Sequence, residues 1–355
     1  MKKNHLLFGA IFIILAACNK AETPSSENFE SITKDVLSDF PAFVAIPQYS
    51  DLYLKATELE TAVQQLIATP GDDKLNATRQ AWRDMRSIWE KSEGYLFGPV
   101  EDDEYDPQMD TWPVDYVQMD SLLASSNPLE VSDIQSLSTL SLRGFHPVEY
   151  VLWGKDGNRN AASLTDREKK YIQSLATDLK NICKSLHDSW HPSSGNFGQN
   201  LVNAGQPGSV YATKLEAYMA ITEAMIGICE EVGEGKMEEP YAALDSAIVE
   251  SPFSGNSVTD FKNNIIGLQN VYFGKWTSDG KGLNDVVSAR NLSLDNNIQQ
   301  KIAAAISSFD AISLPYEQAI FDQRTQIKNT QNALADLADL LNNDLKPFLV
   351  QNIKD

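Results

Sequence analysis

The chain has 355 residues and a formal net charge of −20, from 49 acidic and 29 basic side chains. Such a surface disfavours nucleic acids and anionic lipids as partners, because their phosphates carry the same sign. It attracts cations, although the need for solubility explains the charge equally well. The length is sufficient for about two domains.

The N-terminus has the features of an export signal. Lys2 and Lys3 precede an apolar run over residues 6–15, which is too short to span a bilayer, since a spanning helix needs about 20 residues. The following Leu15-Ala16-Ala17-Cys18 resembles a bacterial lipobox, which implies cleavage after residue 17 and attachment of lipid to Cys18. We therefore predict a signal peptide over residues 1–17 and a lipid anchor.

Residues 18–28 are polar and lack a core-forming period, so they predict a flexible lipidated tether. Asn19 differs from the aspartate that some bacteria use for inner-membrane retention. The expected location is therefore the cell envelope, at the outer membrane of a Gram-negative bacterium, with membrane contact through the lipid on Cys18.

Helical periodicity dominates the rest of the chain. Apolar residues recur at intervals of three and four, and no sustained alternation typical of strands is present. The clearest apolar stripes lie within residues 52–67, 75–89, 171–186, 218–232 and 334–345. Ser163 to Asp166 predicts a capping box for the third helix, and Pro315 the start of a long final helix. The pattern predicts an all-α fold of antiparallel helical bundles.

Residues 191–209 are rich in Gly, Ser and Asn and predict a linker. They separate a first helical half, residues 29–190, from a second half, residues 210–355. A second irregular stretch, residues 98–113, is acidic and carries Trp112. Long loops without secondary structure of their own are often functional.

A weak internal similarity and two cysteines are further features of the sequence. Residues 144–150 are weakly similar to residues 267–273, which suggests that the halves are related by duplication, with the chemistry kept in the first. Cys183 and Cys229 lie in apolar helical patterns, so we expect two buried free thiols rather than a disulfide framework.

The most informative segment surrounds His146. Pro147 suits the first turn of a helix, which places His146 at or near the N-cap and Glu149 within the first turn. Three helical positions put the two side chains on one face, about 60° apart. The pair can share a cation, or the carboxylate can orient the imidazole and raise its pKa. Simple capping and stabilisation of the first turn explain the same residues without a ligand.

A metal ion at this pair needs further ligands, because zinc sites use three or four protein ligands. The chain has no His-Glu-x-x-His motif, so the third ligand must come from elsewhere. Glu93 is the first candidate. Weaker candidates are Asp102, Asp103, Glu104 and Asp110. A mixed nitrogen and oxygen set suits iron or zinc better than calcium.

Two other patterns are better explained without a metal. His187 and His191 are four residues apart, but histidines in the last turn of a helix already stabilise its dipole. The acidic run over residues 101–106 lacks the spacing and the glycine of an EF-hand, so we expect a solvated loop there.

The motif Gly144-x-His146-x-x-Glu149 resembles the G-x-H-x-x-E motif of the imelysin-like proteins. Further segments resemble blocks of that family in the family's order: residues 89–93, 97–99, 110–113, 250–254 and 260–264. The likeness extends from about residue 30 to the C-terminus.

This resemblance implies two helical-bundle halves with the motif near their junction. It also implies an exported protein linked to iron uptake, and a metallopeptidase assignment accompanies the family name. By resemblance, the ligand-binding site comprises Gly144, His146 and Glu149 at its centre, Glu93 and Trp112 as its wall, and Ser254 and Asn263 from the second half.

Three functions are compatible with these observations. The first is an envelope protein that binds iron, another metal or an iron-bearing ligand through His146, Glu149 and Glu93. The low number of histidines favours this binding function over catalysis. The second is a zinc peptidase in which Glu149 or Glu93 acts as general base. The third is a non-catalytic lipoprotein that uses the cleft for an envelope protein partner.

Overall fold

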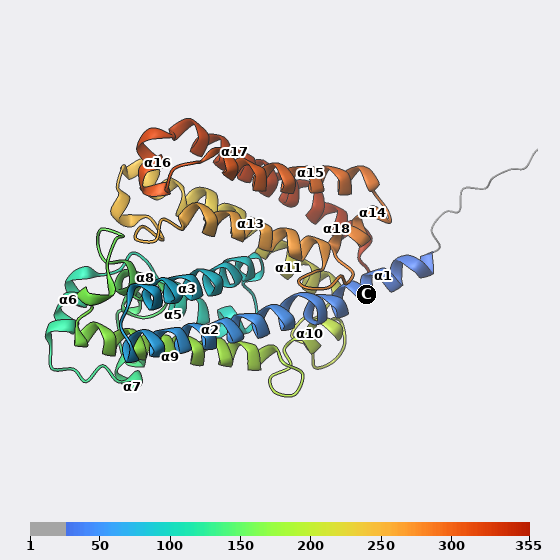
Figure 1. The fold of residues 1–355 in the computed structure, drawn as a ribbon. Helices are drawn as coiled ribbons and strands as arrows, with labels where there is room; N and C mark the ends of the chain where they lie inside the picture. Colours follow the sequence, from blue (N-terminus) through green and yellow to red (C-terminus); the bar gives the residue numbers. More distant parts are fainter. Residues whose placement is uncertain (1–25) are drawn as a thin grey trace, which may run out of the picture.

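The computed structural model describes residues 26–355 (Figure 1). The predicted signal peptide and Cys18 lie outside these residues, so export and lipid attachment stay predictions. Residues 26–28, expected to end the tether, instead begin the first helix. Within residues 26–355, no helix is both long and apolar enough to cross a membrane.

The first half contains these helices: α1 (Ser26–Asp39), α2 (Ile46–Ala68), α3 (Asp72–Ser92), α4 (Pro99–Asp102), α5 (Tyr105–Asp110), α6 (Tyr116–Ala124), α7 (Val131–Gln135), α8 (Phe145–Trp153) and α9 (Asp166–Trp190). The remainder contains α10 (Gly198–Val202), α11 (Lys214–Glu230), α12 (Glu238–Ala243), α13 (Ser257–Phe273), α14 (Leu283–Ser288), α15 (Leu292–Ser308), α16 (Tyr316–Asp322), α17 (Arg324–Leu340) and α18 (Lys346–Asn352).

Short helical turns connect several of these helices. Three are π-helical: η1 (Phe40–Ala45), η5 (Glu231–Lys236) and η8 (Leu341–Leu345). Five are 3₁₀: η2 (Glu93–Tyr95), η3 (Leu140–Leu142), η4 (Ala161–Ser163), η6 (Ser246–Ile248) and η7 (Phe309–Ala311). The described chain has one isolated β-bridge and no strand, which confirms the predicted all-α fold.

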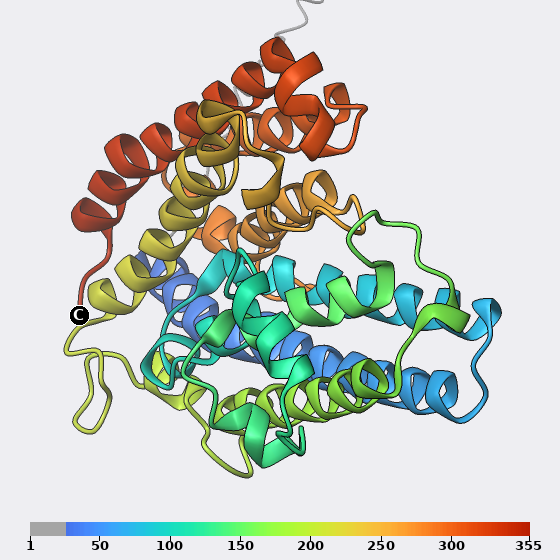
Figure 2. The ribbon, with the colours of Figure 1, turned by 90° about the vertical axis from the view of Figure 1, so that its left-hand side faces the viewer.

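The helices form two packed layers. In the first half, α2 packs against both α3 and α9, while in the second half α17 packs against α11 and α15. Figures 1 and 2 show the two layers one above the other, with the C-terminal helices in the upper layer. The predicted apolar stripes face these cores: Leu52, Leu59 and Leu334, for example, are fully buried. The fold therefore follows from helical amphipathicity.

Helices α3 and α13 meet where the two halves join. A Cβ on Gly267 would lie 2.1 Å from the carbonyl oxygen of Lys91, and a Cβ on Gly94 would lie 2.6 Å from the backbone nitrogen of Leu268. Only glycine permits backbones to approach so closely. Residues 145–150 and 268–273 are helical in both of the weakly similar segments, but the glycines differ: Gly267 is in the middle of its helix, whereas Gly144 precedes α8 with a φ of 87°.

The two stretches expected to be irregular contain short helices. Residues 98–113 include α4 and α5, so the expectation of a long unstructured loop was wrong. Pro99 suits the start of α4, and the left-handed residue Glu104 separates the two helices. The predicted linker contains α10, which packs against α1; the division into halves at residues 191–209 stays a prediction.

Two local predictions need correction. The capping box of α9 is formed by Thr165 and Glu168 rather than by Ser163 and Asp166, because Glu168 Oε2 accepts the Thr165 N–H at 2.9 Å. The final helix is interrupted at Gln323, whose side-chain oxygen accepts two backbone N–H groups of the preceding loop. The two expected free thiols, Cys183 and Cys229, are buried, and neither forms a disulfide within residues 26–355.

Candidate functional site

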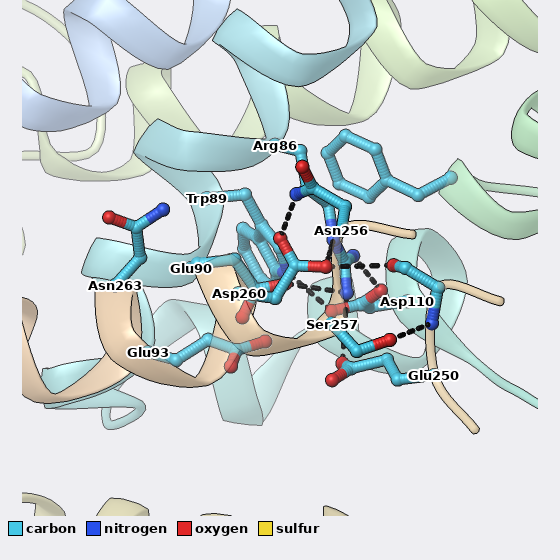
Figure 3. Close-up of polar contacts among 12 residues, drawn as sticks. Arg86, Trp89, Glu90, Glu93, Asp110, Glu250, Asn256, Ser257, Asp260 and Asn263 are labelled. Carbon is cyan, nitrogen blue, oxygen red and sulfur yellow. Dashed lines mark hydrogen bonds and ion pairs between the residues drawn. The ribbon is translucent and has the colours of Figure 1, made fainter. Parts of the chain in front are cut away.

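A fully buried arginine, Arg86 on α3, occupies the centre of a charged cluster between the two halves (Figure 3). Its guanidinium contacts Asp110 at the end of α5, lies 2.5 Å from Glu90 Oε1, and donates to Glu250 Oε1 at 2.8 Å. Its Nε lies 3.8 Å from Asp260 Oδ2. One cation therefore joins carboxylates from both halves.

Lys236 of η5 supplies a second buried cation. Its Nζ lies 2.8 Å from Glu93 Oε2 and 2.9 Å from Glu250 Oε1. The side-chain amide of Asn264 donates to Glu93 Oε2 at 2.6 Å and to Glu90 Oε2 at 2.7 Å. Glu250 thus accepts from Lys236 and Arg86 together, and it connects the two parts of the cluster.

The His146 motif lies beside Asp110. Gly144 is the N-cap residue of α8, so His146 is the second helical residue and Glu149 the fifth. Both lie later than expected, and Glu149 falls outside the first turn. Its Nε2 lies 2.9 Å from Asp110 Oδ1, and its Nδ1 lies 3.8 Å from Glu149 Oε2. The indole of Trp89 donates to Asp110 Oδ2 at 2.6 Å. Asp110 therefore fixes the motif against α3.

Ser254 connects Glu149 to the second half. Both its backbone N–H and its hydroxyl donate to Glu149 Oε1, at 2.7 and 2.6 Å, while Arg83 donates to its carbonyl oxygen at 3.0 Å. The second oxygen of Glu149 is buried and has no hydrogen-bond partner among the described residues. Ser254 thus orients the Glu149 carboxylate and leaves one oxygen available.

The structure brings most of the predicted site residues together. Trp112 forms part of the wall: its ring centroid lies 6.2 Å from that of His146, and Lys236 Nζ lies 5.4 Å from the indole. Asn263 does not enter the cluster, because its amide donates to Ser87 Oγ at 3.4 Å. The adjacent residue of α13, Asn264, takes that place. Because successive residues of a helix are rotated by about 100°, the side chains of Asn263 and Asn264 point in different directions.

Neither of the two buried cations was among the residues predicted from the sequence. Arg86 lies within the apolar stripe of residues 75–89, and a charge on a core-facing stripe was the available signal, since buried charges must be paired. Lys236 offered no comparable signal. Glu90, Glu250 and Asp260 lie within the segments that resemble family blocks, but helical periodicity does not predict that their side chains meet in one cluster.

The facing charges shift the pKa values of His146 and Asp110. Burial alone would raise the pKa of Asp110, but Arg86 and His146 outweigh it and hold that pKa well below its usual range. Burial alone would lower the pKa of His146, but Asp110 and Glu149 raise it to about 9. At neutral pH, His146 and Asp110 therefore form a buried ion pair.

Other carboxyl groups of the cluster have raised pKa values. Burial, only partly offset by the neighbouring cations, raises the pKa to about 7 for Glu90, Glu250 and Asp260. Burial and the nearby Glu90 also raise the pKa of Glu93 well above its usual range. Below neutral pH, the cluster therefore carries less negative charge than its carboxyl groups suggest.

We expect the stability of the protein to fall as the pH rises from about 5 to 9. The folded state raises the pKa of Glu90 from 4.5 to about 7 and that of His146 from 6.5 to about 9, so it binds more protons than the unfolded state over this interval. The free energy of unfolding in urea, measured at several pH values with a chelator present, checks this expectation.

The slope between pH 5 and 7 should be shallower in Glu90→Gln, which has no carboxyl to titrate. Glu239→Gln is the matched control, because Glu239 is exposed on α12, and its slope should equal that of the wild type. Identical slopes in all three proteins would contradict the assignment.

Three buried side chains could hold a metal ion. Asp110, His146 and Glu250 each offer a ligand atom, and these atoms all lie within 4.8 Å of one another. Among the described residues, Nδ1 of His146 and Oε2 of Glu250 lack a hydrogen-bond partner, while Nε2 of His146 lies 2.9 Å from Asp110 Oδ1. Unsatisfied buried polar atoms are rare, so they fit a bound ion. One nitrogen with carboxylate oxygens suits iron or zinc.

The placement of Glu93 differs from the predicted ligand set. Glu93 groups with Glu90 and Asp110, and not with His146. Asp110, a weaker candidate in the sequence, belongs to both groups and therefore takes the position expected for Glu93. The structure also places Glu149 next to His146 without including it in either group.

Comparison with known proteins identifies the same family. The profile of the imelysin family matches residues 45–343. Iron-regulated protein A of Synechococcus elongatus is 30% identical over 325 residues, which cover 90% of this chain and 87% of that protein.

Solved structures share the fold. A protein described as an iron-regulated protein A precursor from Parabacteroides distasonis superposes with a TM-score of 0.81 at 25% identity, over 94% of this chain and 97% of that one. An imelysin-like protein from Psychrobacter arcticum gives 0.74 at 14% identity, over 90% and 96% of the two chains. The extent of the profile match and the identity to the cyanobacterial protein show that the chain belongs to the imelysin family.

Proposed function

We propose that this protein is a cell-envelope lipoprotein that binds a metal ion, with iron as the expected ion, and serves iron uptake. The observation that carries the proposal is the convergence of Asp110, His146 and Glu250 beside an excess of buried carboxyl groups. Six buried carboxylic acids of the cluster outnumber its two buried permanent cations, Arg86 and Lys236, even with the half-buried Arg83 near Glu149 and Asp260: they are Glu90, Glu93, Asp110, Glu149, Glu250 and Asp260. Buried charge of one sign requires protons or a cation.

The donor set indicates how an ion would be held. His146 would supply a ring nitrogen, while Asp110 and Glu250 would supply oxygens. Glu149 would hold the imidazole from its other side, a role that outer partners of metal-bound histidines commonly have. Because His146 carries a proton at neutral pH, binding of the ion would release it.

The names of the relatives support iron as the ion. The cyanobacterial relative and the Parabacteroides relative are both described as iron-regulated proteins. A protein produced in response to iron is suited to capture it, and an envelope location would expose the site to solutes from outside the cell. Export, the lipid on Cys18 and outer-membrane placement belong to this proposal.

A peptidase function fits the geometry less well. His146 is 1% exposed, and Glu149, the candidate general base, is fully buried, with one oxygen held by two hydrogen bonds from Ser254. A general base must come within hydrogen-bond distance of its water and substrate. In this conformation, a small ion suits the buried site better than a peptide chain does.

Metal loading tests the proposal. Purified protein is dialysed against ferrous iron without oxygen, or against zinc, and the bound metal is measured by mass spectrometry. We expect stoichiometric binding to the wild type and a loss of affinity of at least about tenfold in His146→Ala and Glu250→Gln, because each removes a ligand.

The matched control is His191→Ala, since the half-buried His191 at the end of α9 lies outside the cluster: its Nδ1 is 2.8 Å from Ser193 Oγ, and its ring centroid is 5.0 Å from that of His187. Its loading should equal that of the wild type. Circular dichroism establishes that each variant is folded. Equal loading of the wild type, His146→Ala and Glu250→Gln would refute the metal site.

A further inference from the structure

A cavity lies beside the charged cluster, lined by residues of α6, α8 and α16, which are at the same end of the molecule (Figure 1). Its volume is about 420 Å³, which is within the range of small-molecule sites. The residues that follow Glu149 and precede Ser254, namely Tyr150 and Phe253, both line it. The cavity therefore adjoins the charged cluster without sharing its ligand residues.

One wall of the cavity is aromatic. The ring centroids of Tyr150 and Phe253 are 5.2 Å apart and those of Tyr116 and Phe253 6.1 Å apart, both pairs with nearly perpendicular planes. Tyr116 and Tyr150 are 5.6 Å apart. All three side chains are only half-buried, so they offer ring surface to a ligand. Such surface favours planar groups and cations, because the faces of aromatic rings carry negative potential.

The charged residues of the cavity favour a cation. Glu317 of α16 lines it, and Oε2 of this carboxylate is buried without a hydrogen-bond partner among the described residues. Asp120 and Lys155 lie exposed at the rim. Two carboxyl groups against one lysine, on a protein of formal charge −20, disfavour an anionic ligand.

We propose that this cavity binds a small organic cation. Its planar part packs on Tyr116, Tyr150 and Phe253, and its charged nitrogen donates to Glu317. The site is distinct from the metal-binding group, because it uses none of the residues that would hold the ion. It gives the protein a second ligand, of amidinium or amine chemistry, at the junction of the two halves.

Three probes of similar shape and different charge test the proposal. Benzamidinium, benzyl alcohol and benzoate are titrated into the purified protein, with binding followed by ligand-detected NMR. We expect benzamidinium to bind most tightly and benzoate least. Failure of all three probes to bind, or equal affinity for them, would overturn the proposal.

Variants assign the binding to this cavity. Glu317→Gln should weaken benzamidinium by about tenfold and leave benzyl alcohol unchanged, since only the cation uses the charge. Tyr150→Leu should weaken both probes, and Tyr116→Leu tests the same wall if the first variant does not fold. Val117→Ala, at an exposed position of α6, is the matched control and should bind as the wild type does. Unchanged benzamidinium binding in Glu317→Gln would overturn the assignment.

The proposed metal site and the proposed cation site can be tested independently of each other. His146→Ala should bind benzamidinium with wild-type affinity even though it lacks the proposed metal ligand. Loss of benzamidinium binding in a folded His146→Ala protein would overturn the claim of a distinct site.

Discussion

Replacement of Arg86 by methionine is expected to destabilise the protein by about 3–5 kcal/mol at neutral pH, which is the usual effect of removing one partner from a buried ion pair. The change removes the cation that contacts Asp110, Glu90 and Glu250 and leaves these buried carboxylates facing one another. Methionine fills much of the volume, so the loss is mainly electrostatic. Urea unfolding at pH 7, followed by circular dichroism, measures the effect.

The pH dependence distinguishes this cause from simple loss of packing. In Arg86→Met the carboxyls have lost their main cation, so their pKa values should rise further and the variant should recover stability as the pH is lowered towards 5. Lys34→Met, at an exposed position of α1, should cost less than about 0.5 kcal/mol at either pH. An equal deficit for Arg86→Met at pH 5 and pH 7 would argue that packing is responsible.

The second large effect is expected at Gly144, where alanine should cost about 3–5 kcal/mol. The backbone there has φ 87° and ψ −154°, a region that is nearly restricted to glycine. A Cβ would also lie 2.0 Å from the carbonyl oxygen of Met109, a backbone atom that cannot move without displacing Asp110. The variant should therefore lose both stability and metal affinity.

Gly208→Ala separates the two causes. Gly208 also has a positive φ, 97°, but a Cβ there would meet nothing within 4 Å. This control should cost only about 1–2 kcal/mol, the strain of the backbone alone. Urea unfolding of both variants measures the difference. Equal losses would mean that the contact with Met109 contributes nothing.

The all-α fold could be predicted from the sequence because the spacing of apolar residues within each helix shows which face is buried. Leu52, Leu59 and Leu334 are buried as their spacing predicts. The sequence also singled out His146 and Glu149, whose three-residue spacing is a local property of one helix. Ser254 came from the family resemblance alone, since nothing in its own surroundings indicates a contact with Glu149.

The rest of the site depends on contacts that no local pattern encodes. The choice between Asn263 and Asn264 is set by the rotation of α13 against α3, which the glycine contacts determine and periodicity does not. Arg86 interrupts an apolar stripe, and the reason, its contacts with Glu250 and Asp260 of the second half, is visible only in the folded structure. Lys236 lies on a π-helical turn, whose altered period moves side chains away from the face that regular α-helical spacing predicts.

The charged cluster also has a consequence for the order of folding. Its contacts join residues that are far apart in the chain: 164 positions separate Arg86 from Glu250, and 143 separate Glu93 from Lys236. Contacts of such sequence separation form late and slow the folding of a domain, because long loops must close first. Until residue 250 has been synthesised, the first half lacks the carboxylate that joins its arginine to the lysine. We therefore expect the site to be among the last parts of the molecule to assemble.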